Sequence, residues 1–131
     1  MRQLITITPF LTLILLSCST EPTKTSYLFI VKVDSIAHPP AVRLNDTIAI
    51  QLFGTIGTNG CYSFSYFDVS LEPRKLDLAV IGEYTGESIC PAVMVYLDGK
   101  EYRCVATERG WFKINIRQPE GEPLRDSVFV N

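Results

Sequence analysis

Apolar and polar residues alternate with a period of two along much of the chain after residue 26, and this pattern constrains the fold more than any other feature. No long stretch repeats apolar residues at spacings of three and four, so the signal of an amphipathic helix is missing. Glycine and proline interrupt the pattern throughout, which limits each regular segment to a short strand. The chain is therefore expected to be all-β.

The expected strands are segments of alternating residues bounded by turn residues. They lie at 27–33, 46–53, 61–71, 75–84, 92–97, 100–106, 110–116 and 126–130. Asp98-Gly99 is the pair that best fits a type I′ turn, so the segments on either side are predicted to form a hairpin. About seven or eight short strands favour an antiparallel sandwich of immunoglobulin-like type, with a small closed β-barrel as the alternative.

The first residues have the three parts of an export signal. These are a positive charge at Arg2, an apolar run over residues 4–16 and a small residue at Ser17. The run is shorter than the ~20 apolar residues of a transmembrane helix and is interrupted by Pro9. We predict a signal peptide over residues 1–17, a polar tether over 18–25, and one β domain over 26–131, whose length suits a single core.

Leu15-Leu16-Ser17-Cys18 resembles the lipobox of bacterial lipoproteins. The resemblance implies that the signal is cut before Cys18, that the sulfur is diacylated and that the new amino group is acylated. An ordinary secretory signal with an incidental cysteine and an uncleaved anchor are the alternatives. Each buried methylene contributes ~0.8 kcal/mol, so several acyl chains would hold the protein on the extracytoplasmic face of a cell-envelope membrane. The rest of the chain then need not touch lipid.

The segment 110–116 reads G-x-F-x-I-x-I and precedes a closing hairpin. This pair resembles the terminal strands of the immunoglobulin-like modules common in bacterial surface lipoproteins. The resemblance implies that alternate residues of this strand are buried, namely Phe112, Ile114 and Ile116. Segments 60–64 and 97–102 add a resemblance to small bacterial lipoproteins that carry no assigned activity. Such a resemblance bears on the fold and not on any chemistry.

Three cysteines remain in the mature chain if Cys18 carries lipid, an odd number in a compartment that permits disulfides. In the predicted hairpin Cys104 faces Val93, so Cys104 is expected to be a buried free thiol. Cys61 and Cys90 lie near strand ends, where a cross-link can join a loop to a sheet. We predict a structural Cys61–Cys90 disulfide, since no C-x-x-C spacing points to redox chemistry.

Several function classes find no support in the sequence. The formal net charge is −2 without any run of like charge, whereas a nucleic-acid binder needs a basic face. His38 is the only histidine and is expected to face solvent in a turn, so no metal site or cofactor is predicted. The glycines of residues 54–60 lack a phosphate-loop pattern.

Two carboxylate pairs are candidates for the acid and base of glycoside hydrolysis, Glu83 with Glu87 and Asp77 with Glu72. That chemistry needs two carboxyl groups ~5 to 9 Å apart in a cleft. We expect these residues on turns and outward strand faces of a chain too short to build a deep groove. No enzymatic activity is therefore predicted.

One outward face could make contact with a partner. Trp111 precedes the inward Phe112, so strict alternation sends Trp111 outward together with Lys113 and Arg117. Aromatic and arginine side chains are enriched at binding hot spots, yet a surface aromatic also serves as cover for a sheet edge. The three residues are a possible contact surface, with edge cover as the alternative for Trp111.

The leading hypothesis for function is a non-catalytic binding or interaction module displayed on a membrane through lipid on Cys18. A second hypothesis is a small inhibitor or protective lipoprotein that presents the loop 54–60 to an enzyme. A third is a hydrolase with an unrecognised site. The expected partners are the membrane and an unidentified protein or ligand, without nucleic acid.

Overall fold

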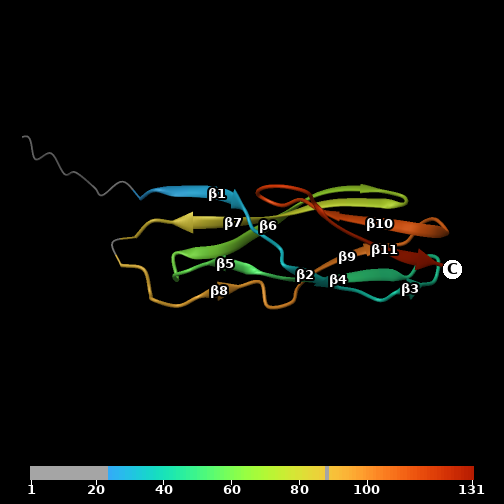
Figure 1. Cartoon of the computed structure of the whole chain (residues 1–131), viewed down its shortest axis with the longest axis horizontal. Coiled ribbons are helices and arrows are strands. Elements are labelled where there is room, and N and C mark those ends of the chain that lie inside the picture. The colour runs from blue at the N-terminus through green and yellow to red at the C-terminus, as the bar shows by residue number, and fades with distance from the viewer. Residues whose placement is uncertain (1–23, 88) are drawn as a thin grey trace, which may run out of the picture.

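The computed structural model describes residues 24–87 and 89–131, and all regular structure in these ranges is β (Figure 1). In this described part of the chain there is no long apolar helix of the kind that crosses a membrane. The predicted signal peptide, Cys18 and the tether up to residue 23 lie outside the described residues. The first strand begins at Ser26, where the β domain was predicted to start.

The strands form the two layers of a sandwich. The larger sheet contains β1 (Ser26–Ile30), β3 (Ala41–Val42), β6 (Tyr62–Glu72), β7 (Lys75–Thr85), β10 (Gly110–Ile116) and β11 (Leu124–Val130). A second sheet contains β2 (Ser35–Ala37), β4 (Thr47–Phe53) and β9 (Lys100–Val105), and β5 (Thr55–Gly57) pairs with β8 (Val95–Tyr96). In Figure 1, β1 and β7 lie in one layer, and β4, β5 and β8 lie in the other. The predicted all-β sandwich is confirmed, and the short strands β2, β3 and β5 were not expected.

Strand β7 organises the larger sheet. One of its edges pairs with β6 along the length of both strands. The other edge is shared, because β1 pairs with the end of β7 (Ser26 opposite Thr85) and β10 pairs with its beginning (Lys113 opposite Lys75). The β7–β10 and β3–β11 pairs are parallel, and the other strand pairs are antiparallel. Parallel neighbours need a long crossover, which the excursion of the chain through the second layer supplies.

The core lies between the layers and is built from alternate residues of the longer strands. Ile48, Ile50 and Leu52 of β4 are completely buried, as their alternation predicts. The burial implied for β10 is confirmed, since its inward residues are at most 1% exposed: Phe112, Ile114 and Ile116. Each such side chain contributes about 1.5–3 kcal/mol to folding, and this contact fixes the two layers against each other.

A β-bulge in β6 changes the face on which one aromatic lies. Strict alternation would place Tyr62, Phe64 and Tyr66 on one face of the strand, but the register shifts between Phe64 and Tyr66. Tyr66 is consequently 47% exposed, and Phe67 takes the inner face against Tyr102, with ring centroids 5.6 Å apart. A bulge adds one residue to the strand, and every later side chain is therefore inverted relative to strict alternation.

The Asp98-Gly99 turn forms, but the predicted hairpin does not. Both residues have positive φ, 47° and 77°, and the Lys100 N–H donates to the Leu97 carbonyl over 3.0 Å. The flanking strands nevertheless pair elsewhere, β8 with β5 and β9 with β4. The turn residues reverse the chain, whereas burial against β4 decides which strand β9 joins.

Candidate functional site

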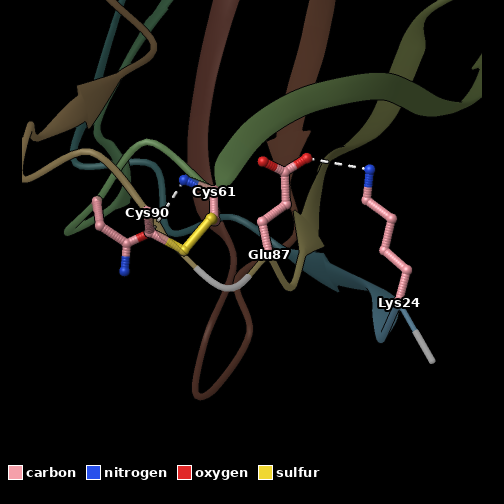
Figure 2. The surroundings of a disulfide bond; sticks show 5 residues. Lys24, Cys61, Glu87 and Cys90 are labelled. Carbon is pink, nitrogen blue, oxygen red and sulfur yellow. Dashed lines mark hydrogen bonds and ion pairs between the residues drawn. A yellow bond between two sulfur atoms is a disulfide. The ribbon is translucent and has the colours of Figure 1, made fainter. Parts of the chain in front are cut away.

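The Cys61–Cys90 disulfide forms as predicted (Figure 2). Cys104 is a buried free thiol. The two bridged Cα atoms are 5.2 Å apart. Cys104 lies opposite Ile48 of β4, and burial raises the pKa of its thiol. The expected partner of Cys104 was wrong, because Val93 is 54% exposed. The free thiol was still predicted correctly, since alternation along β9 itself points Cys104 inward.

The disulfide lies at the end of the sandwich where the described chain begins, which we call the tether end. The Thr85 N–H donates to the Cys61 carbonyl over 2.9 Å, and the Gly86 N–H donates to the Thr25 carbonyl over 2.6 Å. Lys24 and Glu87 form an ion pair of 3.0 Å close to the bridge (Figure 2). The cross-link, the first strand and the segment that precedes it are therefore neighbours.

At the other end of β7, Trp111 points outward as its alternation predicts and is 55% exposed. It stands opposite Phe129 of β11, and the two rings meet edge to face with centroids 5.2 Å apart. Strand β10 is paired on both sides, with β7 and with β11. The pairing with β7 begins at Lys113, so only β11 lies beside β10 at Trp111, and this position fits either partner contact or edge cover.

Cationic side chains gather beside this aromatic pair. Arg74, Lys75 and Lys113 line a shallow hollow together with Trp111. The parallel register places Lys113 opposite Lys75, and the Lys113 N–H donates to the Arg74 carbonyl over 2.9 Å. We call Trp111, Phe129, Arg74, Lys75 and Lys113 the distal patch.

Two carboxylates, Asp77 and Glu72, partly offset the charge of the distal patch. Lys75 Nζ lies 2.9 Å from Asp77 Oδ2, and this contact raises the pKa of Lys75. The pKa of Asp77 is lowered, chiefly by Lys75 and then by the hydrogen bond from Asn115. Arg74 and Lys113 leave the distal patch with a positive balance.

Of the three residues predicted as a contact surface, the structure brings two together. Arg117 shares the outward face with Trp111 and Lys113 but lies about 20 Å from Trp111 along the strand. Its guanidinium forms an ion pair with Asp68 of β6. Arg117 therefore belongs to a separate surface contact.

Sequence reasoning missed Phe129, Arg74 and Lys75. The alternation of the last strand carried a signal for Phe129, because Val128 and Val130 are buried on either side of it. No local signal identifies Arg74 and Lys75, since only the parallel pairing of β7 with β10 brings them beside Lys113.

Three of the four candidate carboxylates for hydrolysis form contacts with other side chains, and the fourth is exposed. Glu83 Oε1 accepts a hydrogen bond from the Ser26 hydroxyl over 2.9 Å, and Glu87 pairs with Lys24. Asp77 pairs with Lys75 and Asn115, and Glu72 is exposed at the end of β6. Within residues 24–87 and 89–131, no three or more His, Cys, Asp and Glu side chains are grouped so that they could hold a metal ion.

His38 is not the solvent-facing turn residue that was expected, because its side chain is only 9% exposed. Its Nε2 lies 3.0 Å from Asp126 Oδ2, and its Nδ1 lies 2.9 Å from the carbonyl oxygen of Pro39. The pKa of Asp126 is lowered, first by the N–H of Ser127 and then by His38. The pair ties the turn after β2 to β11 across the two layers.

The segment 54–60 is largely built into the sandwich. Ile56 and Gly57 are buried in β5, and the Tyr62 ring packs so closely on Gly57 that a Cβ atom has no room there. The Gly60 N–H donates to the Pro91 carbonyl over 2.8 Å. These contacts leave little of the segment as a protruding loop.

Exposed apolar side chains occur in the distal patch at one end and around the disulfide at the other, and others such as Tyr96 and Val105 lie elsewhere on the surface. The two ends are separated by the length of β7, an 11-residue strand of about 35 Å. Comparison with protein-family models, with curated proteins and with solved structures found no match for this chain.

Proposed function

We propose that this chain is a lipoprotein of the bacterial cell envelope, anchored through acyl chains on Cys18, whose β-sandwich is a non-catalytic interaction module. The contact surface in this proposal is the distal patch. The lipobox resemblance at residues 15–18 supports the anchor, and the position of the distal patch supports the binding role.

The observation that carries the binding role is an exposed aromatic pair beside cations at the end of the sandwich away from the tether. In Figure 1 the start of β1 and the C-terminus lie at opposite ends of the sandwich, and Phe129 lies two residues before that terminus. Lys113 pairs with Lys75 at the beginning of β7, whereas Ser26 pairs with Thr85 at its end. If the domain is anchored through the segment that precedes β1, the distal patch faces away from the membrane.

The chemistry of the distal patch resembles that of a binding hot spot. Tryptophan and arginine are the side chains that most often dominate an interface, because they bury a large area and keep polar groups available. Trp111 already rests on Phe129 and is held in place before any partner arrives. Little side-chain entropy is then lost on binding. The cations Arg74 and Lys113 favour a partner with an acidic surface.

The anchor is tested with Cys18→Ala, which removes the thiol that would be acylated. We expect the wild-type mature protein to carry the added mass of acyl chains on its N-terminal cysteine and to enter the detergent phase. The variant should remain in the aqueous phase. Intact mass and detergent partitioning read both results, and a wild-type protein without added mass would refute the anchor.

The binding role is tested by co-purification from solubilised envelopes with Trp111→Ala. We expect affinity for a partner to fall by about 2 kcal/mol or more, which is about 30-fold. Tyr66→Ala is the matched control, because Tyr66 is a 47% exposed aromatic on the same sheet outside the distal patch. Equal retention of the partner by wild type and Trp111→Ala, or equal loss in both variants, would remove the role of the distal patch.

A further inference from the structure

A run of apolar residues is exposed at the tether end. Ile89 is 81% exposed, Val93 54% and Met94 47%, and Pro91 and Ala92 between them are exposed as well. Isolated surface apolar residues are common, but a contiguous exposed run of this length is unusual unless it has a partner. We call residues 89–94 the apolar loop.

The fold holds the apolar loop in place. Cys90 is bonded to Cys61, and the Pro91 carbonyl accepts hydrogen bonds from the Gly60 N–H over 2.8 Å and from the Val93 N–H over 2.9 Å. The exposure of Ile89 therefore belongs to a cross-linked segment and not to a free end.

The apolar loop is next to the point where the chain leaves the described structure. Glu87 pairs with Lys24 (Figure 2), and the Thr25 carbonyl accepts a hydrogen bond from the Gly86 N–H. Residues 18–23 span at most ~20 Å even when fully extended. A bilayer that holds Cys18 by acyl chains must then lie within this distance of Lys24, which pairs with Glu87 two residues before the apolar loop.

We infer, on the basis of the proposed lipid anchor, that the apolar loop contacts the bilayer that holds Cys18. This contact fixes the orientation of the sandwich on the membrane. The occupant of the apolar loop is the interfacial layer of that bilayer, into which Ile89, Val93 and Met94 insert. The neighbouring charge is no obstacle, because Glu87 is paired with Lys24. Seating at this end directs β7 away from the membrane and keeps the distal patch about 35 Å from it.

The test uses tryptophan as a depth probe, since the chain contains a single tryptophan, Trp111, at the far end. The full-length lipidated protein is reconstituted in vesicles of phosphatidylethanolamine and phosphatidylglycerol with brominated acyl chains. We expect Ile89→Trp in a Trp111→Phe background to lose about half of its fluorescence and to shift to the blue, because the ring reaches the acyl boundary. Met94→Trp in the same background serves as a second position.

The wild-type protein is the matched control, and Trp111 should be unaffected by the brominated lipid. Intact mass of the same samples reports acylation of Cys18 independently. Acylated protein with unquenched probes at 89 and 94 overturns the membrane contact and leaves the anchor standing. Equal quenching of Trp111 also overturns it, because the sandwich would then lie flat. Protein without acyl chains overturns the proposed anchor, and the inference with it.

Discussion

The two ends of the sandwich are stabilised in different ways. At the distal end the inner face of β10 packs into the apolar core, where Phe112 is 1% exposed and Ile114 is fully buried. At the tether end the inner face carries half-buried rings, such as Tyr62 and Tyr84 with centroids 4.8 Å apart, and Tyr27 is 48% exposed. The disulfide and the Lys24–Glu87 pair occur at this second end.

This difference indicates where a small domain needs a cross-link. Burial of apolar surface stabilises a strand in proportion to the area covered, and this contribution is largest where the opposite layer covers it completely, as around Phe112. Where the layers cover the rings only in part, the Cys61–Cys90 bond limits the freedom of the unfolded chain instead. Each end is consequently free to expose a different surface, aromatic and cationic at one end and apolar at the other.

The largest expected effect comes from the core at the distal end. Phe112→Ala should lower the free energy of unfolding by about 3–5 kcal/mol, because it leaves a cavity in the core. Trp111→Ala, one residue away on the opposite face, should cost about 1 kcal/mol for the lost edge-to-face contact. Urea denaturation of both variants measures the two losses in the free energy of unfolding. Similar losses for the two would show that the outer face also supports the fold.

At the tether end, Cys61→Ala with Cys90→Ala should cost about 3–4 kcal/mol, since the bridge closes a loop with a sequence separation of 29. Hydrogen exchange should also show local opening of the Gly86 amide at this end. The Lys113 amide at the distal end should follow the global stability alone. An unchanged urea midpoint in the double variant would contradict the stabilising role of the cross-link.

A smaller loss of stability is expected for a substitution at Cys104, which lies in the middle of the fold. Cys104→Ala should cost about 1 kcal/mol, because it removes one buried heavy atom. In the wild-type protein Cys104 should react with an alkylating reagent only as fast as the domain unfolds, since burial raises the pKa of the thiol. Peptide mapping after alkylation reads this directly. Rapid labelling of Cys104 under native conditions would be inconsistent with its buried position.

The smallest effect concerns the link between the layers. The pKa of Asp126 is lowered in the folded protein, so its carboxylate stabilises the fold above the ordinary value of 3.8. This contribution is lost as the pH falls from about 5 through the lowered pKa. Because Asp126 is about half exposed, we expect less than about 1 kcal/mol. Asp126→Asn should flatten the acid limb of the stability profile, and an unaltered limb would contradict this contribution.

Much of the fold was predictable because alternation is a property of each strand by itself. The inward faces of β4 and β10, the outward position of Trp111 and the inward position of Cys104 all follow from a period of two. The Cys61–Cys90 bridge followed by elimination once Cys104 was assigned to the core. The signal peptide and the lipid on Cys18 lie outside the described residues and remain predictions.

The pairing of strands was decided by the tertiary structure. The Asp98-Gly99 turn is local and formed as its residues require, yet β8 and β9 joined different partners. The bulge that turns Tyr66 outward leaves no mark in the alternation of the sequence. The parallel contact of β7 with β10 brought Arg74 and Lys75 to Trp111. Side-chain alternation is set within one strand, whereas strand partners are set by competition for burial among segments far apart in the chain.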